Sequence, residues 1–166
     1  MIAYHGTDKE FEKFDNKFMA AEESYEQLGS GFYFCDYIER CQQHGNIILT
    51  CEIPDEGYVH QFDDTVMPTR DQIRRLISLS SDYDALTNFG DVEYYGRKAI
   101  IEQAVDQFEG NTYFQLCLVL ARDLYKYDSY GFNQAFHEVT GYVGTQDCHV
   151  YCVFSASNIK IINHNT

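Results

Sequence analysis

The sequence predicts an α+β fold, with strands at both ends of the chain and a block of helices between them. Apolar runs with strand character occur most clearly at 46–53 and return at 150–154 and 159–162. Between about 68 and 139 the apolar residues recur instead with helical spacing. The 166 residues contain no repeat or linker and 45% are hydrophobic, so we expect a single domain over 1–166 with one core.

The elements before the helical block are marked by short apolar runs bounded by turn residues. The phenylalanines of the polar stretch that follows the first strand are expected to lie on the core. In order, we expect a strand at 2–4, a loop or short helix at 8–28, a strand at 31–34, a helix at 36–45, a strand at 46–53 and an extended piece at 57–63.

The helical block is expected to hold four helices. Pro68 is a favourable first helical residue, and Ile73, Leu76 and Ile77 continue with helical spacing. The other three helices are expected at about 96–108, 112–125 and 130–139.

The charge of the chain restricts its partners. A formal charge of −14 disfavours nucleic acid and anionic membranes, which bind proteins through cations, and favours a basic partner or simply a solvated acidic surface. No run approaches the roughly 18 apolar residues of a spanning helix, and no basic region followed by an apolar one opens the chain. The six cysteines show no paired spacing. We therefore expect a cytoplasmic protein with reduced cysteines.

Three segments together resemble the NAD-binding signature of the ADP-ribosyltransferases. They are "YHGT" at 4–7, "GSGFYFCD" at 29–36, and "YCVFSASNIKI" at 151–161 with "GYVG" at 141–144 before it. The resemblance is to the branch typified by diphtheria toxin and the poly(ADP-ribose) polymerases, and to its small phage and bacterial members. It covers about the first 55 and the last 30 residues.

The resemblance implies a split, mixed and mostly antiparallel sheet with the helical block inserted between its N- and C-terminal strands. It implies that NAD is a substrate rather than a redox cofactor. His5 would bind a ribose hydroxyl, Gly6 would let the backbone approach the nicotinamide carboxamide, and Tyr33 would stack on the nicotinamide ring. Further NAD-binding positions would be Thr7, Ser30, Gly31, Cys41, His44 and Gln146.

Two of those positions depart from the family pattern. Cys41 and His44 stand where the polymerase branch carries a serine and a second stacking tyrosine. An imidazole can also stack, whereas a thiol is a weaker hydrogen-bonding group than a hydroxyl. Cys41 and His44 also share a spacing seen at zinc sites, but no second pair of ligands accompanies them, so no metal is expected.

The third catalytic position is open among three residues. The family's closing strand usually begins with a glutamate that stabilises the ribosyl cation, and Val150 occupies that position here. Asp147, Gln146 and His149 lie just before it. Asp147 is the only carboxylate of the three and is our choice, its alternative role being a turn aspartate.

These expectations define two hypotheses of different classes. The first is a mono-ADP-ribosyltransferase that modifies a macromolecular target, most simply a protein with a basic patch. By analogy with phage members, it would act in the host cytoplasm as a mobile-element effector, for instance against CRISPR defence. The second is a non-catalytic acidic protein with a degenerate NAD site, which blocks a basic partner through its charge.

Overall fold

The computed structural model confirms an α+β chain. It describes residues 1–19, 28–80 and 84–165. The chain forms two compact units: a sheet unit, Met1–Gln61 with Tyr142–Thr166, and a helical unit, Phe62–Gly141. The expected helical block, about 68–139, falls within the second unit.

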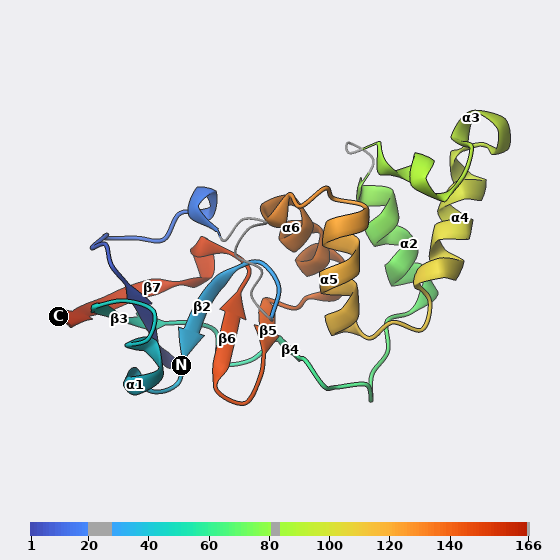
Figure 1. Cartoon of the computed structure of the whole chain (residues 1–166). Coiled ribbons are helices and arrows are strands. Elements are labelled where there is room, and N and C mark those ends of the chain that lie inside the picture. The colour runs from blue at the N-terminus through green and yellow to red at the C-terminus, as the bar shows by residue number, and fades with distance from the viewer. Residues whose placement is uncertain (20–27, 81–83, 166) are drawn as a thin grey trace. The chain divides into compact units, whose positions relative to one another are not determined.

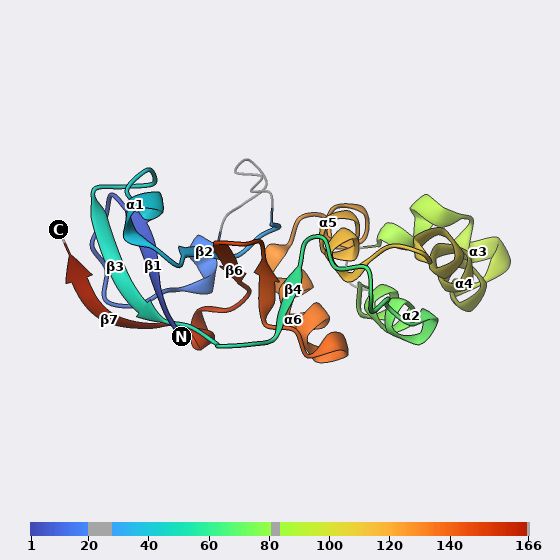
Figure 2. The ribbon, with the colours of Figure 1, turned by 90° about the horizontal axis from the view of Figure 1, so that it is seen from below.

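The sheet unit is built on one mixed sheet (Figures 1 and 2). Its strands are β1 (Ile2–Thr7), β2 (Phe32–Cys35), β3 (Ile47–Glu52), β4 (Tyr58–His60), β5 (Gly144–Gln146), β6 (Val150–Val153) and β7 (Lys160–Asn165). Their order is β4-β5-β6-β2-β1-β3-β7, antiparallel throughout except for the β4–β5 pair. The mixed, mostly antiparallel sheet was expected, whereas β5 was not.

The sheet parts between its two central strands. The register of β1 with β2 comprises a single pair, Tyr4 with Cys35, whereas β1 pairs with β3 along its whole length. Beyond that pair β1 and β2 diverge, so the backbone of each can face a ligand instead of its neighbour.

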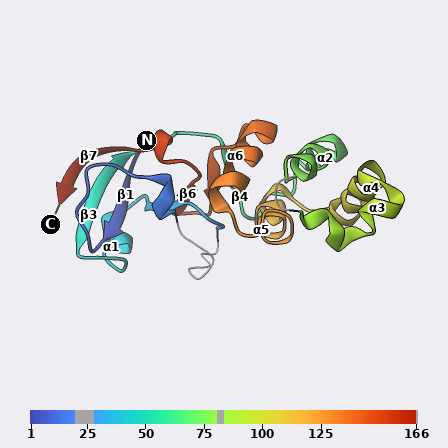
Figure 3. The same cartoon turned by 90° about the horizontal axis from the view of Figure 1, so that it is seen from above.

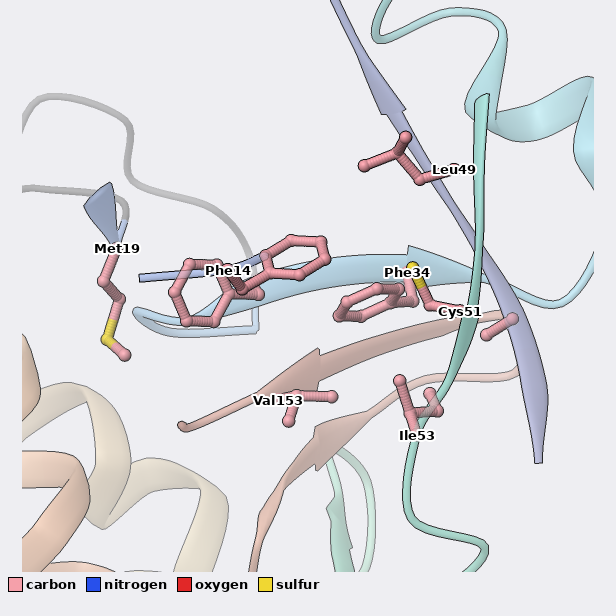
Figure 4. Close-up of a cluster of buried hydrophobic side chains, with 9 residues drawn as sticks. Phe14, Met19, Phe34, Leu49, Cys51, Ile53 and Val153 are labelled. Carbon is pink, nitrogen blue, oxygen red and sulfur yellow. The ribbon is translucent and has the colours of Figure 1, made fainter. Parts of the chain in front are cut away.

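A cluster of buried side chains covers one face of this sheet (Figure 4). Phe14 lies in it, with its ring centroid 5.2 Å from that of Phe32 and 5.5 Å from that of Phe34. Phe11 packs against the same cluster, as the spacing predicted. The same expectation is wrong for Phe18, which is 74% exposed. Phe18 ends the short 3₁₀ helix η1 (Asn16–Phe18), and the Lys17 ammonium lies 4.8 Å from its ring centroid. The remainder of the expected 8–28 segment, 20–27, lies outside the described residues.

The helical unit confirms the four expected helices, and its described residues form two further short ones (Figure 3). Its elements are α2 (Arg70–Leu79), the 3₁₀ helix η3 (Ala85–Phe89), α3 (Val92–Tyr95), α4 (Arg97–Phe108), α5 (Tyr113–Asp123) and α6 (Ser129–Thr140). The first helix starts two residues after Pro68, because the Thr69 hydroxyl accepts from the Gln72 amide and makes Thr69 the N-cap. Helix α2 packs against α4 and α6. No helix in the described ranges is both long and apolar enough to cross a bilayer.

Candidate functional site

A cavity of about 710 Å³ lies in the sheet unit where β1 and β2 diverge. This volume is in the range of pockets that hold small molecules and cofactors. The walls are formed by the C-terminal half of β1, by β2, by the 9–18 segment, by the short helix α1 (Ile38–Cys41) with the turn after it, and by the β5–β6 turn. Every lining residue belongs to the sheet unit.

His5 and Tyr33 are joined directly across this opening. The Nδ1 atom of His5 lies 2.7 Å from the Tyr33 carbonyl oxygen and donates to it. Burial lowers the pKa of His5, and this outweighs the opposing effect of the Tyr33 hydrogen bond, while nearby His44 lowers it further. A neutral imidazole with its proton on Nδ1 keeps Nε2 as a hydrogen-bond acceptor. His5 can thus accept a hydrogen bond from a hydroxyl group of a ligand in the cavity.

The Tyr33 ring is fixed by its own hydroxyl, which donates to the Gly29 carbonyl at 2.5 Å. Gly31, between them in the sequence, lies against β6. A Cβ at Gly31 would meet the Cys152 sulfur at 2.5 Å and the Val153 carbonyl oxygen at 2.7 Å. Gly31 therefore allows β2 to pack closely against β6. Tyr33, two residues further along the chain in β2, lines the cavity.

Helix α1 forms another part of the wall and lies very close to β1. A Cβ at Gly6 would come within 2.1 Å of the Cys41 carbonyl oxygen, so only glycine permits this approach. Cys41 also donates its thiol hydrogen to the Tyr4 carbonyl at 2.9 Å, and the His44 amide donates to the Cys41 carbonyl at 2.9 Å. Cys41 stands where the polymerase branch has a serine. Its thiol hydrogen is used within the protein, in the bond to the Tyr4 carbonyl.

Asp147 occupies the β5–β6 turn and lines the cavity. Its Oδ1 accepts from the amides of His149, at 2.9 Å, and Val150, at 2.8 Å. This is the turn-aspartate role that sequence reasoning held as the alternative. Its Oδ2 has no hydrogen bond to any residue in the described part of the chain, so it can accept one from a ligand.

The other two candidates for the third position are directed elsewhere. The His149 imidazole Nδ1 lies 2.9 Å from an Asp36 carboxylate oxygen, and its ring makes an edge contact with Tyr37. Gln146 lies on β5 with its carbonyl accepting from the Gln61 amide. Neither lines the cavity, whereas Val150, the position of the family's glutamate, does.

Most of the predicted site residues are brought together. Those lining the cavity are His5, Gly6, Thr7, Gly31, Tyr33, Cys41, His44 and Asp147. Ser30, Gln146 and His149 do not line it.

Sequence reasoning missed the charged part of the wall. Lys9, Lys13 and Arg40 line the cavity, as does Cys35. The sequence held one usable signal: these three cations all lie close to the "YHGT" and "GSGFYFCD" motifs in a chain with only 12 lysines and arginines.

No family model, no curated protein and no solved structure matches this chain. Within the described residues, no group of three or more His, Cys, Asp and Glu side chains is arranged to hold a metal ion.

Proposed function

We propose that the chain is a mono-ADP-ribosyltransferase that transfers ADP-ribose from NAD to a protein target. The observation that carries this proposal is the His5–Tyr33 pair, hydrogen-bonded at the point where the sheet parts and lining a cavity of about 710 Å³. The pair corresponds, residue for residue, to the histidine and tyrosine of the signature that the sequence resembles.

The charge of the cavity wall supports an anionic ligand. Lys9, Lys13 and Arg40 face the cavity of a chain whose formal charge is −14. Glu10, Asp15 and Asp147 also line it, so formal charges in the wall balance while the molecule as a whole is strongly negative. A local balance matters because fields are screened over about 8 Å at physiological salt. The diphosphate of NAD would contact the two lysines and Arg40.

The reaction would use few groups of the protein. The Tyr33 ring would stack on nicotinamide, a contact worth about 0.5–1.5 kcal/mol beyond its buried area. His5 Nε2 would accept a hydrogen bond from a ribose hydroxyl. When the bond to nicotinamide breaks, the ribosyl carbon becomes cationic, and the Asp147 carboxylate would stabilise it electrostatically. The target's nucleophile would then bond to that carbon and lose its proton.

The target would be recognised outside the NAD cavity. The helical unit has no counterpart in the motif resemblance, and we propose that it binds the target, a host protein with a basic patch in the cytoplasm. Re-surfacing this unit should abolish target modification and leave NAD binding intact. Loss of NAD binding on re-surfacing would contradict this role.

The test is transfer of labelled ADP-ribose from NAD into a bacterial lysate, with NAD binding measured in parallel by calorimetry. Tyr33→Ala should abolish both binding and labelling. Tyr58→Ala is the matched control: its hydroxyl also donates to the carbonyl four residues earlier, of Pro54, yet it does not line the cavity. His5→Ala should reduce binding, with His60→Ala as its control on β4.

The acid is tested by Asp147→Asn, which keeps the acceptor that holds the turn and removes the charge. We expect labelling to fall and NAD binding to persist. Asp91→Asn is the control, because Asp91 likewise accepts from a backbone amide, that of Tyr94. Val150→Glu places a carboxylate at the family's position and should raise the rate. Unchanged labelling in Asp147→Asn would remove Asp147 from the mechanism.

A second function is favoured by one observation: the Asp147 carboxylate is engaged in holding its own turn. If no acid serves the ribosyl carbon, the chain would instead be a non-catalytic acidic protein that blocks a basic partner. Its binding would weaken steeply with added salt and would be unaffected by Tyr33→Ala. Absence of both NAD binding and NAD consumption in folded protein would favour this function over the transferase.

A further inference from the structure

Two thiols lie together in the wall of the cavity. Cys35 is the last residue of β2, and Cys41 is the last residue of α1. Both are buried, both line the cavity, and they pack in one small cluster with Ile48. The Cys41 sulfur is held in place by its hydrogen bond to the Tyr4 carbonyl, at 2.9 Å.

The surroundings make the two thiols unequal. The pKa of Cys35 is lowered, chiefly by its neighbour Cys41 and further by the Arg40 guanidinium; burial and the carboxylates of Asp36 and Asp147 oppose this. The pKa of Cys41 is raised by the same contact and by burial. Of the two thiols, Cys35 is therefore the one that ionises more readily, the division of roles found in reactive dithiols.

A comparison with Cys51 shows that burial by itself does not lower the pKa of a thiol. Cys51 is fully buried in β3, outside the cavity, and burial raises its pKa to about 12. Cys148 is the opposite case, exposed to solvent in the β5–β6 turn. Only Cys35 combines a thiolate-stabilising neighbourhood, a second thiol in contact and a position on the cavity wall, among the cysteines of this chain, all of which the structure describes.

We propose that Cys35 and Cys41 form an oxidisable dithiol, which a hydroperoxide entering the cavity converts into a disulfide. The Cys35 thiolate attacks the peroxide; an S–O bond forms and the O–O bond breaks, which leaves hydroxide or an alkoxide. The Cys41 sulfur then attacks the Cys35 sulfenic acid; the S–S bond forms, the S–O bond breaks, and the Cys41 proton leaves with the oxygen as water. Two thiols thus lose two electrons, and hydrogen peroxide becomes two waters.

The disulfide would alter the cavity itself. It would end the thiol hydrogen bond to Tyr4 and tie the end of α1, with Arg40 and His44 beside it, to the end of β2. The proposal stands on the packing of the two cysteines in one cluster of the cavity wall and does not depend on what the cavity binds.

The test uses the intact folded protein treated with hydrogen peroxide, followed by alkylation of free thiols and mass spectrometry. Trypsin cleaves after Arg40, between the two cysteines, so their disulfide joins two peptides that otherwise separate. Fragment ions distinguish Cys41 from Cys51, which share the second peptide. We expect the Cys35–Cys41 link to be the first oxidation product, to cost the protein two hydrogen atoms in mass, and to reverse with dithiothreitol.

Variants assign the roles of the two sulfurs. Cys41→Ser should leave a Cys35 sulfenic acid that dimedone traps, and Cys35→Ser should abolish the link and the dimedone adduct alike. Cys148→Ser should leave the link unchanged. If oxidation of wild type instead begins at Cys148, as a dimer of two copies, or if Cys35 reacts with iodoacetamide no faster than Cys51, the dithiol proposal is wrong. The wild-type measurements decide this even where a variant fails to fold.

Discussion

The two units of the chain employ their cations differently. In the helical unit Arg70 and Arg74 form ion pairs with carboxylates on α4 and at its end. In the sheet unit Lys9, Lys13 and Arg40 line a cavity instead. Cations that are paired with the protein stabilise its packing, whereas cations around a cavity are placed for a ligand. The proposed NAD site accordingly belongs to the sheet unit of this strongly acidic protein.

Two pairs of glycines differ in a similar way. Gly6 and Gly31 in the sheet unit lie where a side chain would strike a neighbouring strand or helix. Gly110 and Gly141 in the helical unit have positive φ angles of 90° and 79° and nothing within 4 Å of a would-be Cβ. The first pair permits close packing around the cavity, and the second pair ends helices.

The largest expected effect comes from testing that difference. Gly6→Ala places a Cβ 2.1 Å from the Cys41 carbonyl oxygen, so α1 must move away from β1, and we expect a loss of about 3 kcal/mol in the free energy of unfolding. Gly110→Ala meets nothing and should lose only the left-handed backbone penalty, about 1–2 kcal/mol. Urea denaturation followed by circular dichroism measures both. Equal losses would show that packing against α1 is not tight.

Buried hydroxyls should behave alike in the two units. The Thr145 hydroxyl donates to the Leu28 carbonyl and the Tyr125 hydroxyl to the Leu76 carbonyl, each at 2.6 Å. Thr145→Val and Tyr125→Phe leave a buried carbonyl unpaired, so each should cost about 1–3 kcal/mol in denaturation experiments. The exposed Ser78 hydroxyl donates to the Arg74 carbonyl and offers a control, since water can take the place of the lost hydroxyl in Ser78→Ala. A cost for Ser78→Ala as large as the others would contradict the burial argument.

The half-buried His5 makes stability depend on pH. Its folded-state pKa lies below the ordinary value of 6.5, so the unfolded chain binds the proton more readily. The contribution of His5 is complete above pH 6.5 and is lost as the pH falls from there through the folded-state pKa. Urea midpoints of wild type and His5→Gln, compared across that range, should converge as the pH falls. A constant difference would mean that His5 is not buried as a neutral ring.

The smallest expected effect concerns the ion pairs. The Arg74 Nε atom lies 2.5 Å from a Glu102 carboxylate oxygen at the surface. Arg74→Gln should therefore lower the free energy of unfolding less than the buried changes do, and added salt should remove the difference between wild type and variant. Arg40→Gln should do the reverse and weaken binding of ADP-ribose with stability unchanged. If Arg40→Gln destabilises the fold as Arg74→Gln does, the proposed division between structural and ligand-facing cations fails.

The sequence by itself determined the elements with strong periodicity. The α+β class, the strand at 46–53 and the four long helices were predicted because apolar spacing reflects burial on one face. The motifs around His5 and Tyr33 also identified two strands that the sheet places side by side. Their glycines, which carried the resemblance, allow the close packing of α1 and β6.

Only the tertiary structure decided the rest of the cavity. Strand β5 has three residues and no alternation, so its existence depends on pairing with β4 and β6. The choice among Asp147, Gln146 and His149 depends on a turn that directs neighbouring residues to different surfaces. The contact between Cys35 and Cys41 requires α1 to lie on β1. The cavity brings parts of the first 44 residues together with the β5–β6 turn, which is distant in sequence, and local residue patterns carry no information on which such segments meet.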